Sequence, residues 1–415
     1  MTARPSRSLA GGFALFRHRE FACYWTARFI THVSVQMQIV AISWQVWKLT
    51  EDPLDLGFIG LAEFLPAVVL GLITGTLADR HDRRIILIAC YVIESGCAAA
   101  FLWLTWVGMT QAWPIFIILI VLGCARAFAG PASSALLPNL VPPEDFGKAV
   151  ALNSMIWQVA TIGGPALGGA VLLLGADVVY AVALTGIFTA AILIWQLSPR
   201  PVTRHREPLS WETMLAGLTF IWSRPVILGA LSLDLFAVLF GGAMALLPIY
   251  ASDILNVGPV GFGALRAAPG VGAVMVSLWL AQRPINHRMG MIMFVNVGLF
   301  GGSIIVFAIS EWFWLSLAML WLSGAVDMVS VYIRQTVVQL ATPDHMRGRV
   351  SAVNSIFVGA SNELGQFRAG VMGSAIGPVG AVLVGGIATV VVTMWWMKLF
   401  PALRDIDHPD YSANK

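Results

Sequence analysis

Charged residues are scarce in this 415-residue sequence, where aspartate, glutamate, lysine and arginine make up only 11% of the chain. A typical soluble domain has about a quarter. Hydrophobic residues reach 58%, and the mean hydropathy is +0.79. Because so few charges cannot cover the surface of a soluble protein of this length, the composition excludes an ordinary soluble enzyme, a disordered chain and a secreted disulfide scaffold. It predicts an integral membrane protein surrounded by a lipid bilayer.

Cysteine is also rare, with four in the chain, and the net charge is only +3. The spacing of Cys23, Cys90, Cys97 and Cys124 fits neither a metal cluster nor a disulfide framework, so we expect small core side chains and no metal site. The small net charge gives no indication of nucleic acid as a partner. The nucleotide-binding pattern G-x-x-x-x-G-K-[ST] and any nucleophile–base constellation are missing, so we expect no nucleotide, no cofactor and no enzyme activity.

Long apolar runs, in contrast, are abundant. A helix that crosses a bilayer needs about 20 apolar residues, and twelve segments meet this requirement. The predicted spans are residues 22–47, 56–78, 85–107, 113–135, 149–173, 178–198, 225–250, 259–281, 290–310, 312–338, 350–374 and 378–400. The long polar connection after residue 198 contains a segment from Ser210 to Trp222 whose pattern is typical of a short helix lying in the membrane interface.

The basic residues indicate the orientation of these spans. If the N-terminus is cytoplasmic, most of the 25 lysines and arginines lie on the cytoplasmic side, and only Lys48 lies on the opposite side. This bias predicts cytoplasmic termini in the inner membrane of a bacterial-type cell. Arg17, Arg19 and Arg28 interrupt any apolar core of a cleavable signal peptide, so none is expected.

The two halves of the chain resemble each other. In residues 140–169 and 340–370, Pro143 matches Pro343 and Asn153 matches Asn354, and the second and eighth spans align in the same way. The repeat predicts an all-α membrane fold of twelve transmembrane helices in two pseudo-symmetric six-helix halves, with a cavity between them. The predicted parts are an N-terminal arm (1–21), a first half (22–198), a central loop (199–224), a second half (225–400) and a tail (401–415).

One motif follows the second span at its cytoplasmic end. It comprises Gly75, Asp79, Arg80, Arg83 and Arg84, and it resembles the G-x-x-x-D-R-x-G-R-R signature of the major facilitator superfamily. The resemblance implies the fold of that superfamily and a latch that stabilises the outward-open state. Asp82 stands where the family usually has glycine. The alternative is a simple positively charged membrane anchor.

Two further motifs resemble those of the superfamily. Arg126 and Gly130 match its R-x-x-x-G pattern, and residues 163–169 resemble the end of its antiporter motif. The helix-packing candidates in that second motif are Gly164, Pro165, Gly168 and Gly169. Small residues at this spacing allow close helix packing, which is the alternative to a role in export.

Longer stretches resemble the enterobactin-exporter and transmembrane-secretion-effector branch of the superfamily. These stretches are residues 63–66, 233–242, 246–248, 265–273, 343–357 and 361–367. The resemblance covers nearly the whole chain and implies export, but it leaves siderophore and drug cargoes open. At Arg368 the branch pattern leads us to expect an acid.

Ionisable residues inside the spans are costly, at about 2.5–3.5 kcal/mol each near a helix centre, so each should pair or face water. Asp234 is the leading candidate for proton coupling. The other candidates for proton coupling are Glu363, Asp327 and His32. The candidates for a substrate cavity are Arg28, Gln36, Arg126, Arg334, Asn362 and Gln366. Structural ion pairing alone is the alternative for any of them.

Spacing adds detail to these candidates. Arg28, His32 and Gln36 are four residues apart and form one stripe on the first span. Asp327 and Arg334 are seven residues apart, or about 10 Å along a helix axis, so each should have its partner on another helix. Glu63 and Arg266 occupy matching positions in the repeat and are candidates for an ion pair between the halves.

Together these features predict a proton-coupled efflux transporter that works by alternating access as a monomer. It exchanges protons for a small organic solute of the siderophore type. A drug exporter of the same fold is the first alternative. A membrane sensor or scaffold that does not transport is the alternative from another class.

Overall fold

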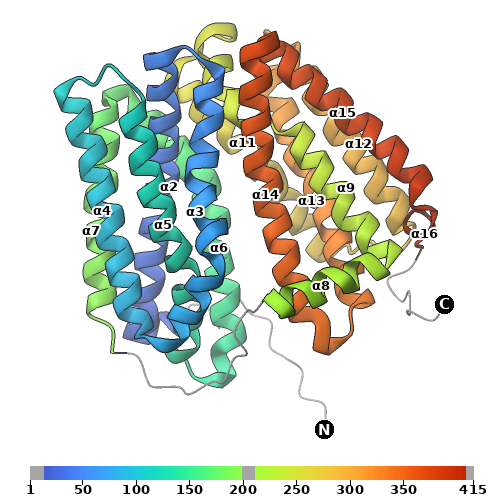
Figure 1. The fold of residues 1–415 in the computed structure, drawn as a ribbon, viewed down its shortest axis with the longest axis horizontal. Coiled ribbons are helices and arrows are strands. Elements are labelled where there is room, and N and C mark those ends of the chain that lie inside the picture. The colour runs from blue at the N-terminus through green and yellow to red at the C-terminus, as the bar shows by residue number, and fades with distance from the viewer. Residues whose placement is uncertain (1–13, 199–210, 408–415) are drawn as a thin grey trace. The chain divides into compact units, whose positions relative to one another are not determined.

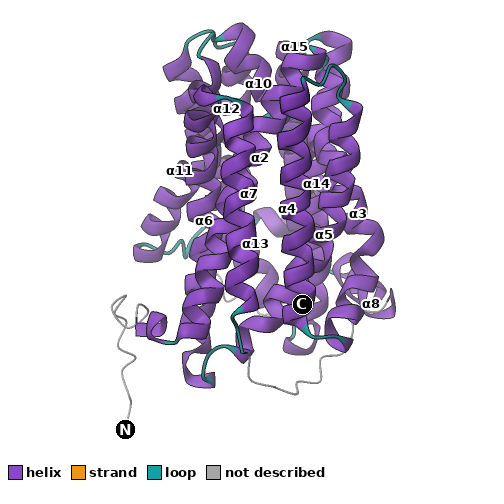
Figure 2. Cartoon of the chain, turned by 90° about the vertical axis from the view of Figure 1, so that its left-hand side faces the viewer, coloured by secondary structure: helices purple, strands orange, loops and turns teal. Residues whose placement is uncertain are grey.

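The computed structural model describes residues 14–198 and 211–407, and every regular element within them is a helix (Figures 1 and 2). Twelve of these helices have 17 residues or more and overlap the twelve predicted spans. They are α2 (Arg19–Thr50), α3 (Pro53–Arg80), α4 (Arg83–Val107), α5 (Trp113–Leu136), α6 (Phe146–Val171), α7 (Ala176–Trp195), α9 (Pro225–Gly241), α11 (Gly258–Gln282), α12 (Met289–Ala308), α13 (Phe313–Ala341), α14 (Asp344–Ile376) and α15 (Pro378–Leu399). The prediction of an all-helical membrane fold is confirmed.

Short helical elements connect or extend the long ones. These are η1 (Ala14–Arg17), η2 (Leu137–Asn139), η3 (Pro143–Asp145), η4 (Leu172–Leu174), α8 (Trp211–Ser223), η5 (Met244–Leu246), α10 (Leu247–Ile249), η6 (Tyr250–Ile254) and α16 (Pro401–Arg404). The predicted seventh span is therefore built from α9 and three short elements that continue it to Ile254.

Ten helical segments of the described chain are both long and apolar enough to cross a membrane. The two long helices outside that group are α2 and α14, with 32 and 33 residues. Both are long enough to cross, but they carry arginines and other polar side chains along their length, such as Arg28 in α2 and Arg368 in α14. The polar candidates of the sequence are concentrated on these two helices.

Local sequence accounts for several helix ends. Asp82 is the N-cap of α4, and its side chain accepts a hydrogen bond from the backbone N–H of Arg84 at 2.9 Å. A residue that departs from the superfamily signature therefore starts the next helix, because a capping carboxylate satisfies a backbone donor that has no partner within the helix. Gly377, with φ of 80°, and Pro378 separate α14 from α15, the usual order of a helix stop and a helix start.

The helix predicted in the central loop is present as α8 (Trp211–Ser223), while its predicted cap, Ser210, lies outside the described residues. Figure 1 shows α8 near the ends of α9 and α14, and α8 contacts both. A Cβ atom at Gly217 would lie 3.0 Å from the carbonyl oxygen of Arg349, so α8 approaches the α14 backbone closely. Its position in the membrane interface stays a prediction.

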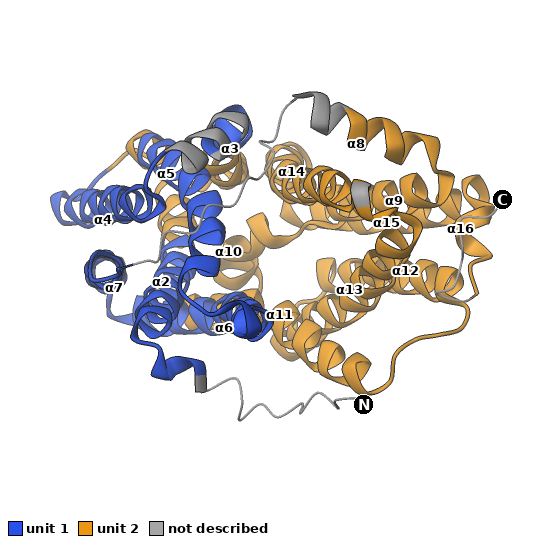
Figure 3. Ribbon diagram, turned by 90° about the horizontal axis from the view of Figure 1, so that it is seen from below, with its two compact units in different colours: residues 1–41, 65–109, 117–208 blue, residues 42–64, 110–116, 209–415 orange. Residues whose placement is uncertain are grey.

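The chain divides into two compact units (Figure 3). The first comprises residues 1–41, 65–109 and 117–208, and the second comprises residues 42–64, 110–116 and 209–415. The segment 42–64, where α2 ends and α3 begins, thus belongs to the first predicted half by sequence and to the second unit by its contacts.

Candidate functional site

The second unit contains a buried ion pair. Asp234 of α9 accepts a hydrogen bond from Nη1 of Arg334 of α13, and these residues are 6% and 5% exposed. The two positions are 100 residues apart in sequence. Because a buried charge without a partner is strongly destabilising, each of these two groups offsets the charge of the other. Arg334 therefore has its partner on another helix, as the spacing from Asp327 predicted.

Asp327 lies on α13 two turns before Arg334 and interacts electrostatically with both Asp234 and Arg334. The cluster thus contains two carboxyl groups and one guanidinium. Its net charge is −1 if both acids are ionised and zero if one of them holds a proton. A cluster in which one proton sets the charge balance suits a site that loads and releases a proton.

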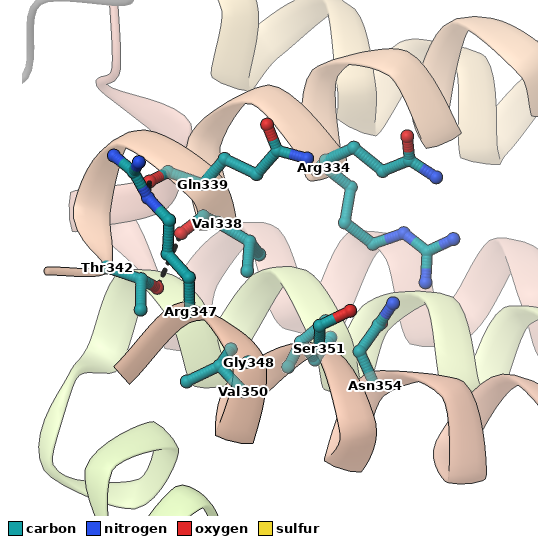
Figure 4. Close-up of a pocket in the computed structure, with 11 residues that line it drawn as sticks. Arg334, Val338, Gln339, Thr342, Arg347, Gly348, Val350, Ser351 and Asn354 are labelled. Carbon is teal, nitrogen blue, oxygen red and sulfur yellow. Dashed lines mark hydrogen bonds between the residues drawn. The ribbon is translucent and has the colours of Figure 1, made fainter. Parts of the chain in front are cut away.

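A cavity of about 520 Å³ in the second unit is lined by Arg334 of this pair (Figure 4). Its walls come from α9, α13 and α14. The lining residues are Leu231, Arg334, Gln335, Val338, Gln339, Thr342, Arg347, Gly348, Val350, Ser351 and Asn354. Seven of these eleven residues are polar, and Figure 4 shows Ser351 and Asn354 of α14 facing Arg334 of α13.

Arg368 is the arginine found where an acid was expected. Its Nε donates to the carbonyl oxygen of Leu239 at 2.9 Å, and its Nη2 donates to that of Phe240 at 2.6 Å. Both carbonyls belong to the last turn of α9, where the helix dipole is negative and carbonyl groups lack partners within the helix. A cation is favoured there and an acid would be repelled, so Arg368 fixes the end of the helix that carries Asp234.

A second polar cluster surrounds Glu363 of α14. Its Oε2 accepts a hydrogen bond from Gln366 at 3.0 Å, and Arg266 of α11 interacts with it electrostatically. The same oxygen lies against Gly60 of α3, so closely that a Cβ atom there would overlap it. The candidates Glu363, Gln366 and Arg266 are thus brought together. Asn362 is exposed and donates instead to the carbonyl of Val358 on its own helix.

The predicted partner of Arg266 was Glu63. Glu63 lies on α3 and has interaction partners of its own. Arg266 also interacts electrostatically with Glu363. The Glu63–Arg266 pair stays a prediction.

The start of α3 packs against α14 through glycines. A Cβ atom at Gly370 would lie 2.7 Å from Cα of Gly57 and 2.8 Å from the carbonyl oxygen of Pro53, and one at Gly373 would lie 2.9 Å from Cβ of Pro53. The rings of Phe58 and Phe367 are 5.4 Å apart between centroids. Backbone contacts this close need glycine on at least one side, so the segment 53–60 and α14 form one tight surface.

The end of α2 joins the same surface. Lys48 Nζ and Trp47 Nε1 donate to Ser252 Oγ at 3.1 and 3.2 Å. In the predicted orientation these contacts lie at the non-cytoplasmic ends of the helices, and they explain why residues 42–64 belong to the second unit.

The first unit brings together part of the polar stripe on α2. Arg28 Nη1 donates to Ser133 Oγ of α5, and Arg28 Nη2 donates to His32 Nε2 at 3.4 Å. His32 Nδ1 lies 2.9 Å from the carbonyl oxygen of Arg28. The two contacts occupy both ring nitrogens of a neutral imidazole with its proton on Nδ1. His32 also packs edge-to-face on Trp157 of α6 at 5.9 Å and interacts electrostatically with Arg126 of α5.

The third residue of that stripe contacts the glycine-rich motif of α6. A Cβ atom at Gly164 would overlap Cβ of Gln36, and one at Gly168 would lie 3.0 Å from Cα of Met37. Pro165 and Gly169 are buried on the same helix. In the first unit the motif therefore provides a close α2–α6 contact, which is the packing role that small residues at this spacing permit.

The latch motif spans the end of α3 and the start of α4. The side chains of Gly75, Asp79 and Arg80 lie outside the described part of the chain. Arg83 Nη1 donates to the carbonyl of Ala135 at 3.1 Å, and Arg84 Nη2 donates to that of Trp195. These two arginines bind carbonyls near the ends of α5 and α7 within the first unit, where a helix dipole favours a cation.

Sequence reasoning assigned no role to three residues that the structure makes prominent. Ser133 accepts from Arg28 through its hydroxyl group and from the Tyr24 hydroxyl through its carbonyl oxygen, and no pattern in the sequence distinguishes it. Glu94 of α4 is 2% exposed, and its Oε2 has no hydrogen-bond partner among the described residues. Asn354 lines the cavity, and the internal repeat, in which it matches Asn153, was the signal that could have singled it out.

Comparison with known proteins gives a family. The model of the transmembrane secretion effector family matches residues 10–415. A relative described as an enterobactin exporter from Citrobacter koseri is 28% identical over 402 residues, covering 94% of each chain. Another from Salmonella choleraesuis is 27% identical over 397 residues, covering 93% of this chain and 94% of the relative.

Solved structures share the fold. A bacterial homologue of the human lysosomal transporter Spinster, inward-facing and unoccupied, has a TM-score of 0.72 at 13% identity and covers 96% of this chain and 97% of its own. A bacterial homologue of the iron transporter ferroportin, inward-facing, has a TM-score of 0.66 at 16% identity and covers 96% and 100%. At such identities the likeness shows the fold alone, which is that of the major facilitator transporters.

Proposed function

Because this chain belongs to the transmembrane secretion effector family of major facilitator transporters, we propose that it exports an organic solute by alternating access in exchange for protons. The membrane is the inner membrane, both termini are cytoplasmic, and the monomer is the working unit. The distribution of lysine and arginine between the loops supports this orientation.

The buried Asp234–Arg334 pair is the observation that carries the proposal. An ionised carboxylate at this depth depends on the guanidinium for its stability. Adding a proton neutralises Asp234, weakens the pair and leaves Arg334 to find another partner. Protonation thus changes the contact between α9 and α13, so the helix packing of the second unit is coupled to the proton.

Asp234 is preferred over the other candidates for physical reasons. A second proton on His32 would place a positive ring nitrogen 3.4 Å from the guanidinium of Arg28, and like charges at that distance repel. Glu363 lies in the tight α3–α14 surface, where it suits a role in closing and opening that surface. Asp327 interacts electrostatically with Asp234, so its charge contributes to the net charge of the cluster that contains Asp234.

The cargo proposed is a siderophore-type molecule. The support for it is that the relatives over nearly the whole chain are described as enterobactin exporters. No nucleotide-binding motif occurs in the sequence, so an ion gradient is the proposed energy source.

The test uses inverted membrane vesicles from a strain that lacks this transporter, with the full chain supplied on a plasmid and enterobactin as the probe. Energised vesicles, acidic inside, should accumulate enterobactin with the wild-type protein, and nigericin should abolish that accumulation by dissipating the pH gradient. Asp234→Asn should lose gradient-driven accumulation and keep counterflow. The matched control is Asp253→Asn, an exposed acid in the same span, which should behave as wild type.

Each other outcome contradicts a defined part of the proposal. Accumulation of ethidium without enterobactin would replace the siderophore by a drug cargo. Gradient-driven accumulation by Asp234→Asn equal to wild type would remove Asp234 from proton coupling. Failure to move any probe, together with full tolerance of Asp234→Asn in the cell, would favour a sensor or scaffold.

A further inference from the structure

We propose that the cavity of the second unit is a water-filled route between the Asp234–Arg334 pair and the cytoplasm, and that Asn354 holds water in it. The inference rests on the proposed proton coupling and identifies where the proton leaves. It assigns a function to Asn354 and Ser351, neither of which is needed to form the ion pair.

The lining of the cavity favours water. Seven of the eleven lining residues have polar side chains, while Val338, Val350 and Leu231 add apolar surface. A volume of about 520 Å³ exceeds the roughly 30 Å³ that a water molecule occupies in the liquid by more than tenfold. A cavity of this size with polar side chains on its wall is hydrated, whereas empty cavities are apolar.

Two buried polar atoms on its walls need a partner. Nε of Arg334 and Oδ1 of Asn354 have no hydrogen-bond partner among the described residues. Figure 4 shows the guanidinium and the amide directed into the same space from α13 and α14. One is a donor and the other an acceptor, and water can satisfy both because it accepts and donates. A buried polar atom left unsatisfied costs about 1–3 kcal/mol, so the pair of atoms favours water between them.

The cavity connects the ion pair to one end of the helices. Leu231 lies one turn before Asp234 on α9 and lines the cavity, so its wall reaches the turn that carries the carboxylate. At the other end, Thr342 lies in the connection between α13 and α14, and Arg347 and Gly348 lie near the start of α14. That connection is cytoplasmic in the predicted orientation.

The charges along this route are balanced. Asp234 of α9 faces Arg334 and Asp327 of α13. At the mouth, Arg347 of α14 forms an ion pair with Asp344 at 2.7 Å, and its side chain is 51% exposed. Because each arginine has an acid beside it, the positive charges that would repel a passing proton are partly neutralised.

The proton step is simple. The O–H bond of the protonated Asp234 breaks, a water molecule of the cavity takes the proton, and the carboxylate left behind pairs with Arg334. The proton then passes along hydrogen-bonded water to the cytoplasm. No redox partner takes part, and no covalent bond to the protein forms.

Accessibility tests the route directly, in a variant with the four native cysteines replaced by alanine. Ser351→Cys and Asn354→Cys should react with membrane-impermeant trimethylammonium-ethyl methanethiosulfonate in inverted vesicles but not in right-side-out vesicles. The matched control is Ser323→Cys, a buried serine of α13 (3% exposed) outside the cavity, which should stay unreactive.

Two results would overturn the route. Reaction from the outside only would place its mouth on the wrong side, and absence of reaction from both sides would show that the cavity is closed to water. Equal reaction of Ser323→Cys would show that labelling reports loosened helix packing, and this too would contradict a defined route.

A second measurement tests Asn354 without any cargo. Purified full-length protein is jumped from acidic to alkaline pH, and a pH dye follows proton release. The kinetic phase that disappears in Asp234→Asn is the proton of that residue. Asn354→Leu, which replaces the carbonyl by apolar groups, should slow this phase about tenfold, equal to 1.36 kcal/mol of barrier, without changing the number of protons. Asn354→Ser, which leaves room for water, should restore the rate to within about twofold of wild type, as expected from the donor and acceptor capacity of a hydroxyl group.

The repeat supplies the control. Asn153 of α6 in the first unit matches Asn354, and its Oδ1 is likewise buried without a hydrogen-bond partner among the described residues. Asn153→Leu should leave the phase unchanged. If Asn354→Leu is as fast as wild type, or if both asparagine variants are equally slow, the role of Asn354 is refuted while proton coupling at Asp234 stands. If Asp234→Asn releases as many protons as wild type, the proposed function itself fails at that residue.

Discussion

Gly370→Ala tests whether the tight α3–α14 surface is one that opens. The methyl group would lie 2.7 Å from Cα of Gly57 and 2.8 Å from its N, with the carbonyl oxygen of Pro53 also at 2.8 Å. All three atoms are backbone and cannot rotate away. The start of α3 must therefore move away from α14 to accept the methyl group, even though alanine suits a helix better than glycine does.

The magnitude follows from the packing. Extra methylene or methyl groups forced into a well-packed contact cost about 1–3 kcal/mol. In a transporter that alternates between two states, a cost paid in only one of them changes their ratio by about 5- to 150-fold. The state with this surface closed should lose population by that factor, while overall folding should change much less because the protein can occupy the other state.

Cross-linking measures that population. Cysteines at Pro53 and Gly373, where an added Cβ atom would lie 2.9 Å from that of Pro53, should form a disulfide on oxidation after a small adjustment. Gly370→Ala in the same background should slow cross-linking about 5- to 150-fold. The control is Gly302→Ala in α12, which has no heavy atom within 4 Å of its added Cβ. A cross-linking rate equal in both variants, with both proteins folded, would refute the reasoning.

Four further predictions concern particular contacts. Arg334→Met leaves the Asp234 carboxylate buried without its guanidinium and should lower the stability measured by thermal unfolding by about 3–5 kcal/mol. Asp234→Leu combined with Arg334→Met should recover most of that loss. A double variant as unstable as Arg334→Met alone would contradict this. Asp82→Ala removes the N-cap of α4 and should cost about 0.5–2 kcal/mol by the same measurement, while Asp82→Asn should be close to wild type. The methyl group of Gly290→Ala would overlap the carbonyl oxygens of Leu403 and Arg404 and displace that segment. Trypsin should therefore cleave after Arg404 faster in this variant, whereas Gly302→Ala should be cleaved at the wild-type rate. If Glu63 and Arg266 pair, Glu63→Gln and Arg266→Gln should not worsen each other's transport defect, and strictly additive losses would exclude the pair.

The sequence was informative about the helices because a bilayer restricts what a chain can do. About 20 apolar residues are needed to cross the membrane, and each backbone polar group must be satisfied within the helix. The predicted spans therefore overlap the long helices of the structure, and α8 was predicted from its pattern alone. There are two exceptions. The seventh span breaks into short elements around Pro248. Helices α2 and α14 carry so many polar side chains that they are not among the apolar membrane-crossing segments.

The functional candidates were harder, since sequence gives the spacing along one helix and not the rotation of that helix against its neighbours. Seven-residue spacing predicted that Arg334 has a partner on another helix but could not select Asp234, 100 residues away, as that partner. The repeat suggested Glu63 for Arg266 but gave no signal for Glu363, which interacts with Arg266 electrostatically in the structure. Asn362, a substrate-cavity candidate, precedes Glu363 in the sequence, but its side chain donates to the carbonyl of Val358 because adjacent residues of a helix point in different directions.

The sequence by itself determined that this chain is a membrane protein built of long helices and an internal repeat, because composition and periodicity express those properties directly. Only the tertiary structure decided which charges neutralise one another, since an ion pair forms between side chains that packing brings within a few ångströms. Arg368 is the clearest case: by sequence it is an arginine in place of an expected acid, and in the folded unit its guanidinium binds the carbonyls that end α9.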